Sequence, residues 1–165
     1  MTRSLRAVCL LAALAPLVAS GELRPVSVTP DSVGAAMITF AHRRVTHVSK
    51  ERGQIGISDA LMASDGRSAG WLVDYRVEGV SDGVAETLVI WRDGKVIRRF
   101  RTEQAFYSWA FRSKGAQVAF HTGPLHGEQT SYCELHDVKT GRRLAVWDGN
   151  LESANKPTWV AGLKH

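Results

Sequence analysis

Alternation of apolar and polar residues dominates the chain from residue 54 onward and predicts β-strands. Trp71, Val73 and Tyr75 share one face of an extended segment, and Asp74 lies on the other. Residues 88–91 are apolar at every position, which is typical of a central strand covered on both faces. The same scheme recurs in four later segments, at residues 107–111, 118–120, 133–135 and 144–146. No segment after residue 50 has helical periodicity, so the chain is predicted to be all-β.

Glycine-containing turns divide this region into two similar units. Gly66 and Gly115 are 49 positions apart, and Gly94 and Gly141 are 47 positions apart. A strand-rich repeat of just under 50 residues is typical of propeller blades. We therefore expect two four-stranded antiparallel sheets, each resembling a blade.

The expected organisation has three parts: residues 1–21, an N-terminal extension or hairpin at 22–53, and the blade-like units at 54–165. The two units cover about 54–102 and 103–148, and a short strand is expected at 158–162. Because a blade cannot bury its faces alone, we expect the two sheets to pack together. A monomer is favoured, with a homodimer as the alternative.

Residues 30–53 fit two structures. Apolar residues from Val33 to Val48 keep helical spacing, and Thr-Pro-Asp at 29–31 resembles a helix start. The β-branched segments 38–40 and 45–48 favour a hairpin instead. The hairpin agrees better with the rest of the chain, and the helix remains the alternative.

The first 21 residues have the features of a secretory signal peptide, expected as a short helix. Arg3 and Arg6 precede an apolar stretch at 7–19, and small residues follow. This stretch is shorter than the ~20 residues that span a bilayer. We therefore expect cleavage near Ser20 or Gly21, a periplasmic or secreted protein, and no stable membrane anchor.

Charge and cysteine content narrow the possible functions. Without the two signal-peptide arginines, 19 basic and 16 acidic residues remain, a net charge of +3. The basic residues are interspersed, so we expect no nucleic-acid partner. Cys133 is then the single cysteine, and its alternation with polar neighbours predicts that it is buried beside Leu135.

Two segments resemble the repeats of WD40-like and TolB-type β-propellers. Leu-His-Asp-Val-Lys-Thr-Gly-Arg at 135–142 is similar to their Asp-Val-x-Thr-Gly hairpin, and Ser-Asp-Gly at 64–66 is similar to their Ser-Pro-Asp-Gly turn. The chain also resembles small exported bacterial proteins that carry no assigned activity. The resemblance implies export and fold but no substrate. Propellers close with four to eight blades; this chain has two clear units, and a third, degenerate one could come only from 30–53 plus the tail.

The loop at 121–128 is the most suggestive polar segment. It holds His121, His126 and Glu128, whose nitrogen and oxygen atoms suit Zn²⁺. The spacing matches no standard ligand motif and no fourth ligand is evident, so we predict no metal site. These three residues, together with Trp159 near the end of the chain, are the candidate ligand-binding residues. The other four tryptophans, at positions 71, 91, 109 and 147, lie inside predicted strands at positions shared with aliphatic residues and are predicted to be core.

Gly-Val-Ser-Asp-Gly at 79–83 satisfies the nucleophile-elbow pattern Gly-x-Ser-x-Gly. That elbow needs a strand followed by a helix, whereas strands are predicted on both sides here. We interpret the segment as a hairpin loop, and we predict no catalytic residue and no cofactor.

These observations favour an exported binding or protein-interaction module without catalytic activity, whose partner is an unknown protein or small ligand. A small-ligand or glycan binder is the alternative. A small hydrolase using Ser81 or His126 is less favoured.

Overall fold

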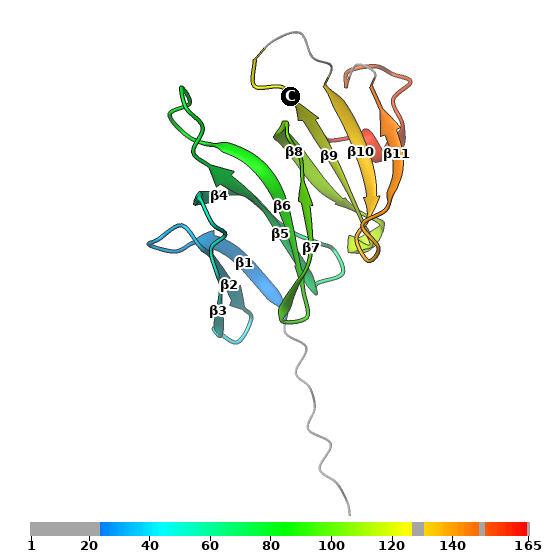
Figure 1. Ribbon diagram of the computed structural model, residues 1–165. Coiled ribbons are helices and arrows are strands. Elements are labelled where there is room, and N and C mark those ends of the chain that lie inside the picture. Colours follow the sequence, from blue (N-terminus) through cyan, green and yellow to red (C-terminus); the bar gives the residue numbers. More distant parts are fainter. Residues whose placement is uncertain (1–23, 127–130, 149–150, 165) are drawn as a thin grey trace, which may run out of the picture.

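The computed structural model describes residues 24–126, 131–148 and 151–164. These residues form eleven β-strands and two short 3₁₀ helices, and none of them is α-helical (Figure 1). The all-β prediction is therefore confirmed. The expected signal-peptide helix lies outside the described residues. Among the described residues, no helix has the length and apolar character needed to cross a bilayer.

The N-terminal sheet is a meander of three strands, β1 (Pro25–Pro30), β2 (Ala36–Phe40) and β3 (Val45–Val48). Strict alternation builds it, because Ala36, Ile38 and Phe40 of β2 are buried whereas the residues between them are partly exposed. The helical alternative is thus wrong. A third strand, β1, pairs with the expected hairpin of β2 and β3.

Asp31 explains why the sequence resembled a helix start. Its Oδ1 accepts hydrogen bonds from the backbone N–H groups of Val33 and Ala35, both at 2.9 Å. These bonds close a tight turn between β1 and β2 instead of capping a helix. Asp side chains serve both purposes, so the local signal was ambiguous.

Two four-stranded antiparallel meanders follow. The second sheet contains β4 (Gln54–Met62), β5 (Ser68–Tyr75), β6 (Val84–Arg92) and β7 (Lys95–Arg101). The third contains β8 (Ala105–Arg112), β9 (Gln117–Gly123), β10 (Tyr132–Asp137) and β11 (Arg143–Trp147). The β6–β7 turn places Asp93 and Gly94 at φ values of 50° and 92°, as a tight hairpin turn requires.

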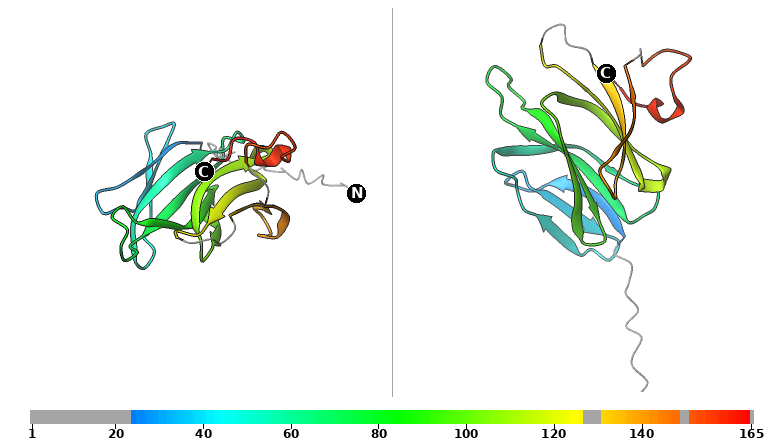
Figure 2. Two further views of the ribbon diagram at one scale, coloured as in Figure 1. Left: turned by 90° about the horizontal axis from the view of Figure 1, so that it is seen from above. Right: turned by 45° about the vertical axis from the view of Figure 1, so that its right-hand side comes forward.

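The second sheet is the central layer of the molecule, which explains its apolar residues on both faces. Trp71 and Trp91 face the N-terminal sheet and pack with Phe40. Leu72 and Ile90 face the opposite way and belong to the core shared with the third sheet. The expectation of two sheets packed together is therefore corrected to three sheets in succession (Figures 1 and 2).

The C-terminal segment covers the outer face of the third sheet. Leu151, Val160 and Leu163 pack there against Cys133 and neighbouring apolar residues. Residues Thr158–Val160 form a 3₁₀ helix, so the strand expected at 158–162 is wrong. Burial of apolar side chains against the sheet face, and not pairing with a sheet edge, decides the conformation of this segment.

The predicted burial of Cys133 is confirmed, since 1 % of the residue is exposed. Trp71, Trp91 and Trp109 are buried as predicted. Trp147 is only partly buried, against the C-terminal segment.

Candidate binding site in a groove between the second and third sheets

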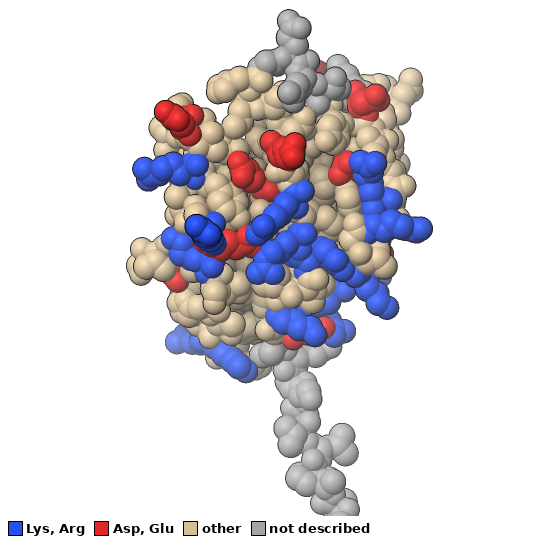
Figure 3. Space-filling view, viewed as in Figure 1, with Lys and Arg blue, Asp and Glu red and all other residues tan. Residues whose placement is uncertain are grey.

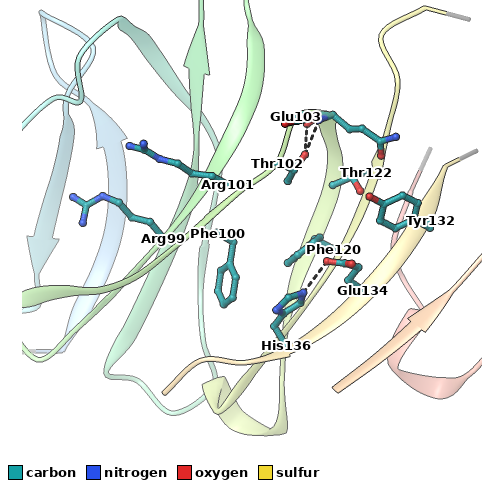
Figure 4. A pocket seen from close by; sticks show the side chains of 11 residues that line it. Arg99, Phe100, Arg101, Thr102, Glu103, Phe120, Thr122, Tyr132, Glu134 and His136 are labelled. Carbon is teal, nitrogen blue, oxygen red and sulfur yellow. Dashed lines mark hydrogen bonds and ion pairs between the residues drawn. The ribbon is translucent and has the colours of Figure 1, made fainter. Parts of the chain in front are cut away.

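A groove of about 700 Å³ opens between the second and third sheets. Its lining comes from the end of β7, the linker at residues 102–104, and strands β9 and β10 (Figure 4). This volume lies within the roughly 300–1,000 Å³ of small-ligand sites.

Alternation along β10 places three polar side chains on the groove side. Tyr132, Glu134 and His136 face the second sheet, whereas Cys133 and Leu135 face the C-terminal segment. The antiparallel register pairs Tyr132 with Thr122 and Glu134 with Phe120 of β9. Neighbouring strands therefore supply adjacent side chains to the same wall.

Glu134 is the electrostatic centre of this wall. Its Oε2 accepts a hydrogen bond from His136 Nε2 at 2.8 Å, and its Oε1 accepts one from Arg143 Nη1 at 2.6 Å. Burial alone would raise the pKa of the Glu134 carboxyl group, but the bonds from His136 and Arg143 outweigh it and lower the pKa. Glu134 is thus an ionised carboxylate whose two oxygens each accept one hydrogen bond.

His136 is fixed on all sides. Its ring stacks on Phe120 at a centroid distance of 5.0 Å and meets Phe100 edge-on at 5.0 Å. Its Nδ1 lies 3.2 Å from the Gly141 carbonyl oxygen, so both ring nitrogens face acceptors. Figure 4 shows His136 between β7 and β10 with its bond to Glu134. This part of the groove is preorganised.

Gln104 lines the same groove and carries an unsatisfied acceptor. Its Oε1 is buried and has no hydrogen-bond partner among the described residues. The backbone of Gln104 is held by Thr102, whose hydroxyl accepts from Gln104 N–H at 2.8 Å and donates to its carbonyl at 2.6 Å. A buried acceptor without a partner is rare and costs about 1–3 kcal/mol, so it needs an explanation.

Two arginines at the rim are turned away from the groove. Arg99 Nε and Arg101 Nη2 donate to the two oxygens of Glu51, at 2.6 and 2.5 Å, and Tyr75 donates to the same carboxylate at 2.9 Å. Burial would raise the pKa of Glu51, but these bonds lower it. Figure 4 shows both guanidinium groups on the far side of β7 from His136. Lys and Arg side chains gather over this part of the surface (Figure 3).

The sequence-predicted ligand residues do not form one site. His121 is buried on the opposite face of the third sheet, where its Nδ1 donates to the Lys164 carbonyl at 3.0 Å. His126 is exposed in the loop that follows β9, and Glu128 lies outside the described residues. Trp159 is partly buried in the 3₁₀ helix against the third sheet. Among the residues whose positions are described, no three His, Cys, Asp or Glu side chains are grouped to hold a metal ion.

The Gly-x-Ser-x-Gly segment lies in the loop between β5 and β6, and Ser81 is exposed there. Strand β6 follows directly. The strand-to-helix turn that gives a nucleophile elbow its geometry is therefore not formed by these residues.

Sequence reasoning missed Gln104, Tyr132, Glu134 and His136. The signal was present as polar residues at alternate positions of β10, beside the predicted core residues Cys133 and Leu135. Their true surroundings depend on β7, which is about 35 residues away in the chain.

No protein-family model matches this sequence, and a comparison with curated proteins finds no match.

Proposed function

We propose that this chain is an exported binding module that holds a small ligand in the groove between β7 and β10. The observation that supports it best is a groove of ligand size that is lined by Gln104, whose buried Oε1 has no partner among the described residues. A bound ligand that donates a hydrogen bond would satisfy this atom once the Gln104 side chain turns its Oε1 toward the groove. The groove thus favours the small-ligand function over a protein-interaction module.

A binding role without catalysis agrees with the polar groups on the wall. The Glu134 carboxylate and the His136 imidazole are bonded to each other, to Arg143 and to a backbone carbonyl. A general acid or base needs a lone pair or proton free to reach the substrate. These two groups serve better as a rigid wall.

We also propose that the three sheets are related to propeller blades. The first strands β1, β4 and β8 lie beside one another in succession, as inner blade strands do. The three-sheet row is not a closed propeller, and the C-terminal segment covers its last face. We include export in the proposal because the first 21 residues have the features of a signal peptide.

Ligand retention tests the proposed function. The mature chain from residue 22, incubated with a small-molecule extract of the cell envelope and washed, is denatured and its bound molecules are identified by mass spectrometry. We expect molecules enriched on the wild type and lost from Gln104→Leu, with Glu78→Gln in the exposed β5–β6 loop as the matched control. Equal retention by wild type and Gln104→Leu, or no retention, would contradict binding in the groove.

A further inference from the structure

We infer that the groove between β7 and β10 takes a neutral, polyhydroxylated ligand, namely a short oligosaccharide. This inference rests on the proposed function and names its ligand class. It follows from the hydrogen-bonding groups, the charge and the ring surface that line the groove.

The hydrogen-bonding groups require a ligand that donates. Gln104 Oε1 is an acceptor, and the Glu103 carboxylate accepts only. The hydroxyl of the partly exposed Tyr132 both donates and accepts, and Figure 4 shows the side chain of Thr122, a residue that is 1 % exposed, close to it at the same end of the groove. Sugar hydroxyls provide both functions. A sulfate has acceptor oxygens only and would leave Gln104 Oε1 unsatisfied.

The charges lining the groove do not favour a cation. The Glu134 carboxylate is already bonded to Arg143 and His136, and Glu51 is bonded to two arginines. Glu103 is then the one lining carboxylate that makes no ion pair in the described part of the chain. The two rim guanidinium groups, although turned away and bonded to Glu51, add positive charge near the groove. A neutral ligand needs no counter-charge in the groove and avoids the cost of removing a charged group from water.

Tyr132 provides the accessible ring. Phe100 and Phe120 also line the groove, but they are 7 % and 2 % exposed and are used to hold His136. Tyr132 is partly exposed, so its face can pack against the C–H face of a pyranose while its hydroxyl group bonds a sugar hydroxyl. The candidate platform therefore lies in this groove and not at Trp159.

An added peptide strand fits less well. Strand β7 is the edge of its sheet and carries Lys95, Arg98, Arg99 and Arg101, and charged side chains oppose strand addition. Arg98 also donates to the carbonyl oxygens of Val138, at 3.1 Å, and Lys139. This contact ties β7 to the β10–β11 turn, so the two sheets cannot separate there.

The test uses the mature chain and an array of neutral di- and trisaccharides, with binders measured by calorimetry. We expect binding of at least one oligosaccharide, with an affinity that does not change between low and high salt, because a neutral ligand is not screened. Gln104→Leu and Tyr132→Ala should each weaken binding about tenfold or more, and Glu78→Gln should not. Sulfated oligosaccharides, inorganic phosphate and an extended neutral peptide are the comparison probes.

Stability provides a second readout. Gln104→Leu removes a buried unpaired acceptor, so the melting temperature of the free protein should stay equal or rise while binding is lost. A fall in melting temperature would mean that Oε1 has a partner, and would overturn the inference. So would an array without binders, or tighter binding of the phosphate, sulfated or peptide probes. If the envelope extract still yields a Gln104-dependent ligand, only the ligand class fails; if it yields none, the proposed function fails as well.

Discussion

At the residue scale, Glu134 connects stability to the groove. One carboxylate receives hydrogen bonds from an exposed arginine and from a histidine held between two phenylalanine rings. The side chain of Glu134 is 12 % exposed, so its charge depends on these partners. Removal of the charge should loosen the wall that the proposed ligand contacts.

Glu134→Gln should lower the free energy of unfolding at pH 7 by about 1–2 kcal/mol, a value reduced by the exposure of Arg143. The folded pKa of Glu134 is lowered, so its contribution is complete above the unfolded value of about 4.3 and is lost as pH falls through the folded pKa. The difference between wild type and variant should therefore shrink below about pH 4. Urea unfolding from pH 7 to pH 3 measures this difference.

The control is Glu78→Gln, because Glu78 is exposed and makes no ion pair in the described structure. Its effect should stay within about 0.5 kcal/mol at every pH. A Glu134→Gln effect that does not vary with pH would mean that the carboxylate charge is not what stabilises the wall.

Gly70 shows how closely the second and third sheets approach. A Cβ atom there would lie 2.6 Å from Trp109 Cη2 and 3.0 Å from the Val89 carbonyl oxygen. Gly70→Ala should therefore lower the free energy of unfolding by about 1–3 kcal/mol through overpacking. In Gly56→Ala the nearest atom, Asp74 Oδ2, is 3.6 Å away, so stability should be unchanged or rise by up to about 1 kcal/mol. Equal losses in the two variants in urea unfolding would exclude the packing explanation.

At the element scale, the C-terminal segment acts as a cover and not as a strand. Its apolar residues protect the face of the third sheet that carries Cys133. Burial raises the pKa of the Cys133 thiol to about 11, so the thiolate is scarce at neutral pH. The reactivity of this cysteine therefore reports whether the cover is in place.

Leu163→Ala should lower the free energy of unfolding by about 2–3 kcal/mol and speed the reaction of Cys133 with a thiol reagent at pH 8, because Leu163 is a buried residue of the cover that packs in the same cluster as Cys133. Leu144→Ala makes the same chemical change at a residue that is 37 % exposed. It should change both quantities little. If Cys133 reacts equally fast in both variants and the wild type, the segment does not protect it.

At the scale of the whole molecule, one sheet joins two cores. The second sheet presents Trp71 and Trp91 to the N-terminal sheet and Leu72 and Ile90 to the third sheet. A substitution that destabilises one core should therefore destabilise the other core as well, because both cores share the strands of the second sheet. The three sheets should unfold as one cooperative unit.

Phe40→Ala removes a buried ring that packs on Trp91 at a centroid distance of 5.6 Å. We expect a loss of about 3–5 kcal/mol. Amide hydrogen exchange should quicken by a similar factor in β2 and in the distant β9. Val45→Ala, at a residue of the same sheet that is 42 % exposed, is the control and should leave both strands protected. Protection retained in β9 alone would show that the sheets unfold independently.

The sequence by itself determined the class of the fold and the position of most strands. Alternation and paired glycine turns are local properties, and strands such as β5, β6, β9 and β10 follow directly from them. The same pattern indicated that Cys133 is buried. Local sequence patterns were ambiguous at Asp31, because this residue type can close a turn or begin a helix. In the structure Asp31 closes a turn.

Only the tertiary structure decided which sheet faces are covered and by what. A period of two residues separates two faces of a strand, but it does not say which distant segment packs on each face. In β10, the C-terminal segment covers Cys133 and Leu135, which leaves Tyr132, Glu134 and His136 facing β7 across the groove. The groove depends on contacts between residues far apart in the chain, and local patterning cannot encode them.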